Sequence, residues 1–222
     1  MELKDVMRTT FAAREFTGED VPDAVIHDLI ENARFAPSGG NRQGNRVIIV
    51  RDAGTRDALA TLAEPAAKRY VAQSKAGESP WNAVTPTKVT AEEIEATRAA
   101  PILINSFRDA SVVLVFVVDL RVVASMDQDL ERIGMISGAS IYPFVWNVLM
   151  GAREAGYGGT ITTLAVAREG DVQKLLNIPS EFAVAAVVPL GKPVKQLTKL
   201  RRKSVEEIAS RESFDGPQFK KD

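Results

Sequence analysis

The chain has 222 residues, with 28 Lys and Arg against 29 Asp and Glu and a formal net charge of −1. Its 45% hydrophobic and 26% charged residues are typical of a globular protein, and the small net charge gives no reason to expect nucleic acid as a partner. The absence of cysteine excludes disulfides, thiolate nucleophiles and zinc–thiolate sites. Because His27 is the single histidine, we expect no metal site, and we expect any enzymatic chemistry to come from a bound cofactor.

The first third of the chain predicts two helices, a strand and a third helix. Apolar residues at helical spacing predict a short helix over residues 3–13 and a second over 22–35. His27 falls on the polar face of the second helix, where we expect it to be solvated. The β-branched run at 47–50 predicts a buried strand, and the alanine-rich segment 54–72 predicts a helix.

Residues 73–105 interrupt this regular pattern. Glycine and proline break the segment repeatedly, and only residues 91–100 are typical of a helix. A connection of this length is usually functional, so we expect a lid-like insertion. Trp81 lies within it and either anchors the loop by burial, which is the commoner role, or stacks on a flat substrate.

The second half of the chain contains a segment that is apolar on nearly every side. A strand is predicted at 112–118 and a long helix at 135–155. Such a helix is buried all round, either in the core of one chain or against a second subunit. Small residues along it, among them Gly138 and Gly151, would let another backbone come close, and they favour a homodimer interface through this helix.

The last part of the chain predicts a helix at 168–176, a strand at 182–189 and a basic tail from about residue 192. Because strands and helices do not alternate strictly, the pattern favours an α+β fold over a doubly wound sheet. The length suits a single domain over 1–222. Since the N-terminus lacks an apolar signal region and no run reaches the ~18 apolar residues of a membrane span, we expect a cytoplasmic protein with no membrane contact.

Two glycine-containing loops are the strongest candidates for ligand binding. The loop at 36–44 combines glycines with the side chains of Ser38, Asn41 and Gln43, and a second loop lies at 156–163. Each follows a helix, so neither matches the dinucleotide fingerprint, which follows a strand; no P-loop motif is present either. Each loop is therefore either a site for some other ligand or a plain surface turn.

Several basic residues are available to bind a phosphate group. Arg8 and Arg14 flank the end of the first predicted helix, and Arg201, Arg202 and Lys203 cluster in the tail. Arginine binds phosphate with two parallel hydrogen bonds. Any one of these residues alone is more often a solvated surface charge, and only their occurrence together with both loops favours a phosphate site.

These motifs resemble those of the nitroreductase-like family of FMN-dependent oxidoreductases. The most specific match is residues 36–43, Ala-Pro-Ser-Gly-Gly-Asn-Arg-Gln, which are similar to the family's APS-x-x-N-x-Q loop. Residues 14–16 are similar to the end of its arginine-rich opening motif, and 200–203 to its basic C-terminal motif. The 135–155 helix followed by 158–163 resembles its dimer helix and flavin loop.

The resemblance implies an α+β fold with a mixed central sheet flanked by helices, and a dimer with two flavins at its interface. It implies that Arg14 and one or more of the basic tail residues hold the FMN phosphate. It also implies that two sets of residues line the flavin: Pro37, Ser38, Gly39, Asn41 and Gln43 in the first loop, and Gly159, Thr160, Ile161 and Thr162 in the second.

The opening motif departs from the family pattern. Where the family often has two basic residues and a serine, this chain has Thr10, Phe11 and Ala12. Arg8 is one candidate for the missing phosphate contact and the Thr10 hydroxyl is another. In addition, Asn45 stands where the family usually has an aromatic residue.

The predicted function is that of an FMN-dependent oxidoreductase. NADPH or NADH would reduce the flavin, which would then reduce a small electron-poor acceptor such as a nitroaromatic or a quinone by a second hydride transfer. No protein side chain is predicted to be catalytic, because the flavin carries the chemistry. The alternatives are a family member that uses reduced flavin for dehalogenation or flavin breakdown, and a non-catalytic protein that binds a flavin or a phosphorylated ligand.

Overall fold

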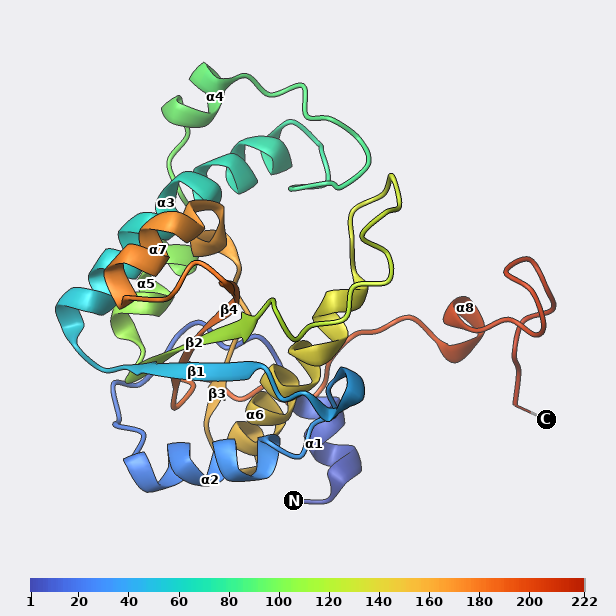
Figure 1. Ribbon diagram of the computed structural model, residues 1–222, viewed down its shortest axis with the longest axis horizontal. Helices are drawn as coiled ribbons and strands as arrows, with labels where there is room; N and C mark the ends of the chain where they lie inside the picture. The colour runs from blue at the N-terminus through green and yellow to red at the C-terminus, as the bar shows by residue number, and fades with distance from the viewer. Residues whose placement is uncertain (222) are drawn as a thin grey trace.

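A computed structural model describes residues 1–221 and shows an α+β fold built on a four-stranded sheet (Figure 1). The strands are β1 (Asn45–Val50), β2 (Val112–Asp119), β3 (Gly158–Gly159) and β4 (Phe182–Gly191), in the spatial order β1-β2-β4-β3. All three strand pairs are antiparallel, and an isolated parallel bridge joins Ala12 to Gly159. The predicted α+β class is therefore confirmed.

The described part of the chain contains eight α-helices. They are α1 (Leu3–Thr9), α2 (Asp23–Ala33), α3 (Ala53–Lys75), α4 (Ala91–Ala96), α5 (Pro101–Asp109), α6 (Tyr142–Glu154), α7 (Glu169–Leu176) and α8 (Val205–Ile208).

The core lies on both faces of strand β2, whose residues 112–118 are all buried. Even-numbered side chains such as Leu114 and Phe116 pack with α2 and α6, and odd-numbered ones such as Val113 and Val115 pack with α3, α5 and α7. The period of two along a strand explains this division. As Figure 1 shows, the sheet therefore separates two helical layers.

Strand β1 is less buried than its apolar sequence predicts. Of its six residues only Val50 is buried, and Ile49 is 47% exposed. The physical reason is its position: β1 pairs only with β2 and forms an edge of the sheet.

The predicted helix at 135–155 is wrong in its first turns. Residues Ile136–Ser140 form a 3₁₀ helix, and α6 begins only at Tyr142 with a proline in its first turn. Proline favours the first turn of a helix, where its missing N–H has no partner to lose, and it is disfavoured further inside. Nor is α6 buried all round in the single chain, because Tyr142 and Trp146 are 42% and 41% exposed.

Other boundaries also move. Helix α1 ends at Thr9, four residues before its predicted end, because Thr10 is already extended. Pro101 starts helix α5 instead of breaking the chain, and α3 continues to Lys75. The irregular part of the predicted lid therefore shrinks to residues 76–90 and the short link 97–100 after α4.

The tail is attached to the N-terminal segment and then leaves the body of the protein. The Val194 amide donates to the Glu15 carbonyl at 3.0 Å, and Gln196 Nε2 donates to the Thr9 carbonyl at 3.1 Å. Beyond this point the chain, including α8, extends away from the sheet and its helices (Figure 1). Within residues 1–221, no helix has the length and apolar character to cross a membrane, and no group of acidic and histidine side chains is arranged to hold a metal ion.

Asp127 organises the loop between β2 and the 3₁₀ helix. Its carboxylate, which is 3% exposed, accepts hydrogen bonds from the Met135 amide at 2.6 Å, from Arg132 Nη1 at 2.8 Å and from the Ile136 amide at 3.3 Å. The Met135 bond, followed by the Arg132 bond, lowers the pKa of Asp127 to about 2. A carboxylate with a lowered pKa stabilises the folded state above the ordinary aspartate pKa of about 3.9, and this contribution is lost as the pH falls toward 2.

We therefore expect Asp127→Asn to lower the urea midpoint at neutral pH, because the amide cannot form the ion pair with Arg132. The difference from the wild type should shrink as the pH is lowered from about 4 to about 2. The matched control is Asp129→Asn, since Asp129 is exposed in the same loop. Equal midpoints for the wild type and Asp127→Asn at neutral pH would contradict the role assigned to Asp127.

Candidate functional site

A cavity of about 680 Å³ lies between α3, α5, the turn at Trp81 and the segment after β3. It brings together five residues predicted from the sequence: Arg14, Trp81, Thr160, Ile161 and Thr162. The other side chains that line it are mostly apolar or hydroxylic: Ala66, Tyr70, Pro80, Ile102, Leu103, Ser106, Thr163, Leu164, Val166 and Ala167.

The position of the 160–162 segment is set by its hydrogen bonds to β4. The Thr162 amide donates to the Val187 carbonyl and the Val187 amide donates to the Thr162 carbonyl, both at 2.9 Å. The Ala13 amide donates to the Gly159 carbonyl at 3.0 Å, which brings the neighbouring Arg14 to the same cavity. Two segments about 150 residues apart in the chain are thereby held side by side.

Gly159 is required where these segments meet. A Cβ at this position would lie 2.6 Å from the Pro189 carbonyl oxygen, 3.1 Å from Val188 Cγ1 and 3.2 Å from Leu149 Cδ2. Contacts this short force the backbone to move. Gly159 is itself buried, so its contribution to the site is to allow the close packing that positions Thr160 to Thr162.

The cavity carries positive charge and hydroxyl groups. Among residues 1–221, Arg14 is the one charged residue that lines it, and its Nη1 makes a long 3.5 Å contact to the Ala12 carbonyl. Thr160 is 3% exposed and Ser106 is 2% exposed, so both are buried polar residues at the cavity wall. Such a site is suited to a planar ligand with an anionic end and hydrogen-bonding edges.

Trp81 is anchored and also lines the cavity. Its amide donates to Gln73 Oε1 at 3.0 Å, and its indole Nε1 donates to the Ala66 carbonyl at 3.4 Å. The Arg69 guanidinium lies over the ring, 4.1 Å from its centre. The burial expected of a loop anchor is incomplete, since Trp81 remains 42% exposed.

The loop at 36–44 does not line this cavity within one chain. Its shape comes from internal hydrogen bonds: the Gln43 amide donates to Ser38 Oγ at 3.0 Å, and the Gly39 amide donates to Ser140 Oγ at 3.1 Å. Asn41 has a φ of +54° and Gln43 a φ of +50°, which side-chain-bearing residues seldom adopt. Pro37, like Gly39, Asn41 and Gln43, is exposed, so the loop presents its groups to the surface near the start of α6.

The remaining predicted phosphate contacts are also outside the cavity. Arg201, Arg202 and Lys203 are exposed in the extended tail. Arg8 is exposed at the end of α1, whereas Thr10 is 5% exposed and its hydroxyl donates to the Val6 carbonyl at 2.7 Å. Of the predicted phosphate ligands, the single chain therefore brings only Arg14 to the cavity.

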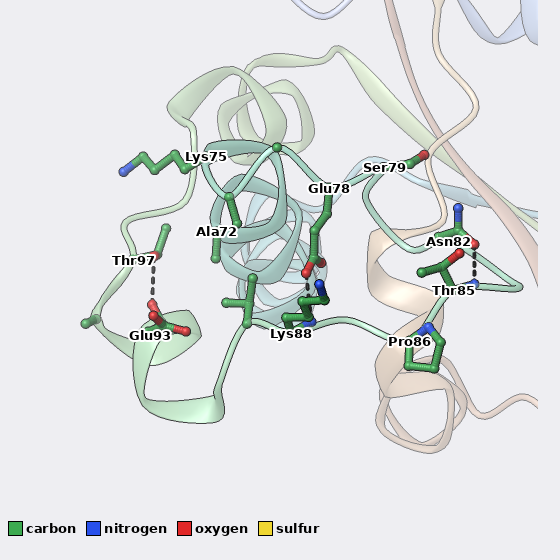
Figure 2. Close-up of a pocket in the computed structure, with 14 residues that line it drawn as sticks. Ala72, Lys75, Glu78, Ser79, Asn82, Thr85, Pro86, Lys88, Glu93 and Thr97 are labelled. Atoms are coloured by element: carbon green, nitrogen blue, oxygen red, sulfur yellow. Dashed lines mark hydrogen bonds between the residues drawn. The ribbon is translucent and has the colours of Figure 1, made fainter.

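A larger cavity, of about 830 Å³, lies inside the lid segment (Figure 2). Figure 2 shows that its polar groups bond to one another: Glu78 accepts from the Lys88 amide at 2.7 Å, and Asn82 accepts from the Thr85 amide at 2.7 Å. Hydrogen bonds from Thr87 and Lys88 lower the pKa of Glu78. None of the predicted site residues lines this cavity, and its bonds shape the lid itself.

Sequence reasoning missed several residues of the first cavity. Tyr70 lies one helical turn after Ala66 on α3, and Ile102 and Leu103 follow the proline that begins α5. The spacing of Ala66 and Tyr70 was visible as a shared helix face. The sequence does not show which face of α3 meets the lid, because this depends on how the lid folds back onto the helix.

A family model describes the same chain. The model of the Nitroreductase family matches residues 7–192. The chain belongs to this family. The match begins within α1, includes all four strands and the residues that line the cavity, and ends where the tail begins.

Solved structures share its fold at low sequence identity. Iodotyrosine deiodinase bound to FMN and 3-iodo-L-tyrosine is 20% identical, with a TM-score of 0.69, and the match covers 96% of this chain and 100% of that one. Nitroreductase A from Vibrio parahaemolyticus is 15% identical, with a TM-score of 0.68 and coverage of 96% and 76%. NADPH:FMN oxidoreductase from Vibrio harveyi, complexed with NAD⁺, is 17% identical, with a TM-score of 0.68 and coverage of 96% and 78%.

The packing around Gly159 yields a stability prediction. Gly159→Ala should lower the free energy of unfolding by about 1–3 kcal/mol, because the new methyl group is overpacked against β4 and α6. The matched control is Gly170→Ala in α7, where a Cβ meets nothing within 4 Å and should add about 0.5–1 kcal/mol. Urea unfolding of both variants measures the difference, and a neutral Gly159→Ala would contradict the close packing.

Proposed function

We propose that this protein is an FMN-dependent oxidoreductase that uses NADPH or NADH to reduce a small electron-poor acceptor. The observation that carries the proposal is the cavity that joins Arg14 to the 160–163 segment in a chain of the Nitroreductase family. FMN in the deiodinase structure and NAD⁺ in the Vibrio harveyi oxidoreductase are in keeping with these ligands.

The residues that line the cavity fit FMN. Its volume of about 680 Å³ accommodates a flavin, and its apolar walls suit a planar ring. Thr160 and Thr162 offer hydroxyls to the polar edge of the ring, with Gly159 holding that segment in place. Arg14 would bind the phosphate, and none of the described residues that line the cavity is a carboxylate that would repel it.

We further propose that a second copy of the chain completes the site. The loop at 36–44 and the basic tail lie outside the cavity of their own chain, and α6 leaves Tyr142 and Trp146 exposed. A homodimer through α6 would cover those side chains and bring Pro37, Ser38, Gly39, Asn41 and Gln43 to the flavin. It would also bring Arg201, Arg202 or Lys203, and with them Arg8, within reach of a phosphate.

FMN would carry out the electron transfer, and the protein would position the flavin. FMN, when bound, supplies two-electron transfer between a nicotinamide and an acceptor. The chain's own residues would hold the ring, exclude water with apolar walls and direct backbone amides and threonine hydroxyls to the polar edge of the ring. Among the described residues, no histidine, cysteine or carboxylate lines the cavity, and the proposal assigns no proton transfer to a side chain.

Two alternatives to this reaction are themselves flavin enzymes, and a third is not an enzyme. The likeness to iodotyrosine deiodinase favours a member that uses reduced flavin for dehalogenation, and flavin breakdown is a related possibility. Outside enzymes, the alternative is a protein that binds a flavin or a phosphorylated ligand without turnover. We propose for all of these that residues 1–222 act as one domain in the cytoplasm.

An absorbance spectrum of the purified protein distinguishes these functions. A yellow protein that bleaches anaerobically with NADPH or NADH supports the oxidoreductase, and reoxidation by a nitroaromatic or a quinone identifies the acceptor class. Iodide release from 3-iodo-L-tyrosine by the reduced protein would favour dehalogenation. Bound flavin that no reductant bleaches would favour a binding protein, and a protein that gains no FMN absorbance would overturn the proposal.

Arg14→Ala should weaken FMN binding about 10- to 150-fold, because a hydrogen bond to a charged group contributes about 1.5–3 kcal/mol. Fluorescence titration of the apoprotein with FMN measures the dissociation constant. Arg34→Ala is the control, since Arg34 pairs with Glu31 at the end of α2, away from the cavity. An unchanged FMN affinity in Arg14→Ala would remove Arg14 from the phosphate site.

Truncation separates the two parts of the tail. Removal of the chain from Leu200 onward should lower flavin occupancy, because it deletes all three basic residues, whereas removal of the residues after Phe214 should leave occupancy unchanged. Flavin absorbance per protein after purification is the measurement. Equal occupancy in both truncated proteins would exclude the tail from FMN binding.

A further inference from the structure

The backbone and side chain of Trp81 are held in one orientation by α3. Ala66, Arg69 and Gln73 are spaced by three and four residues, so they share one face of this helix. Gln73 is 2% exposed and accepts the Trp81 amide, while the Ala66 carbonyl accepts the indole N–H. Trp81 keeps a φ of +55°, a left-handed conformation that residues with side chains seldom adopt without such support.

Arg69 covers one face of the indole. Its guanidinium carbon lies 4.1 Å from the ring centre, and its Nε is buried with no hydrogen-bond partner among the described residues. The attraction between this cation and the π face holds the arginine against the ring. A ligand that stacks on Trp81 therefore meets the opposite face.

The surroundings of Trp81 in the cavity are apolar and exposed. Tyr70 is 44% exposed, Ile102 is 46% exposed and Trp81 is 42% exposed, and all three line the same cavity. Pro80 and Leu103 also line the cavity, and in the described part of the chain Arg14 is the one charged side chain that does so. An uncharged planar ring would cover these side chains, whereas a compact hydrated anion would gain nothing from them.

We propose that Trp81 determines the specificity of the acceptor site by stacking planar aromatic acceptors on the indole face opposite Arg69. Arg69 and Gln73 are positioning residues that fix the angle of the indole. This inference rests on the proposed oxidoreductase function, since it assigns the acceptor end of the same cavity. It adds the residue that selects the acceptor: Trp81 favours an acceptor that is flat, conjugated and uncharged where it meets the indole.

The first experiment measures binding without turnover. FMN-loaded protein, kept oxidised, is titrated calorimetrically with 4-nitrobenzyl alcohol. Trp81→Ala and Trp81→Leu should each weaken binding about tenfold, and Trp81→Phe should stay within about threefold of the wild type, because leucine keeps bulk but only phenylalanine keeps a π face. If Trp81→Leu binds 4-nitrobenzyl alcohol as tightly as Trp81→Phe does, the stacking proposal is overturned. It is also overturned if Trp81→Ala binds this compound as tightly as the wild type does.

The second experiment compares two acceptors in steady state. In Trp81→Ala, the KM for 4-nitrobenzyl alcohol should rise about tenfold, while the KM for ferricyanide, which has no aromatic ring, should be unchanged. An equal loss with both acceptors would mean that Trp81 acts on the flavin or on the fold instead. FMN occupancy and the melting temperature of each variant, including the conservative Trp81→Phe, show whether the lid has been lost.

The positioning role of Gln73 has its own readout. The chain has two tryptophans, so in Trp146→Phe the emission comes from Trp81 alone. Gln73→Leu in this background removes the acceptor of the Trp81 amide, and it should lower the fluorescence anisotropy of the indole and raise the KM for 4-nitrobenzyl alcohol about threefold, with kcat unchanged. Unchanged anisotropy together with an unchanged KM would remove Gln73 from the proposal.

Failure of this inference is distinguishable from failure of the proposed function. A protein that does not bind FMN, or whose FMN is not reduced by NADPH or NADH, overturns the function before any Trp81 variant is compared. Suppose instead that the protein binds and reduces FMN normally, and that its affinity and KM for aromatic acceptors are the same with or without Trp81. This result overturns only the inference.

Discussion

The candidate site depends on the close packing at Gly159. Its carbonyl accepts the Ala13 amide, and its α-carbon faces the Pro189 carbonyl of β4 and the Leu149 side chain of α6. The N-terminal segment, the sheet and the helix beneath it therefore meet at one residue that has no room for a side chain. Arg14 and Thr160 follow directly on the two partners of the Ala13–Gly159 bond, so their place at the cavity is a consequence of this contact.

The helical layers on the two faces of β2 have different roles. α3 and α5, on one face, form the cavity walls, and α6, on the other face, carries exposed aromatic residues. Because β2 is buried over residues 112–118, it fixes the separation of these layers as a rigid partition. The loop at 36–44 belongs to the α6 side through its bond to Ser140, which explains why it does not reach the cavity of its own chain.

The sequence predicts helices and strands well where the periodicity or composition is strong. It predicts them poorly where a single residue decides at which position a helix begins. The valine-rich run at 112–118 and the apolar run at 182–189 predict strands, and both are strands in the structure. Pro101 and Pro143 each follow the rule that proline favours the first turn of a helix, although Pro65 lies inside α3. Applied to both, that rule would have placed the starts of α6 and α5 and shortened the predicted lid.

Prediction of the site stopped where long-range packing begins. The loop motif at 36–43 identified the family, but its left-handed Asn41 and Gln43 and its contact with Ser140 depend on a segment about 100 residues away. Trp81 shows the same limit more sharply. The sequence left anchoring and stacking as alternatives, whereas the structure holds the backbone through Gln73 and one ring face through Arg69, and leaves the residue exposed at the cavity. Since an anchor that fixes one face orients the other, the two roles are compatible in a single side chain.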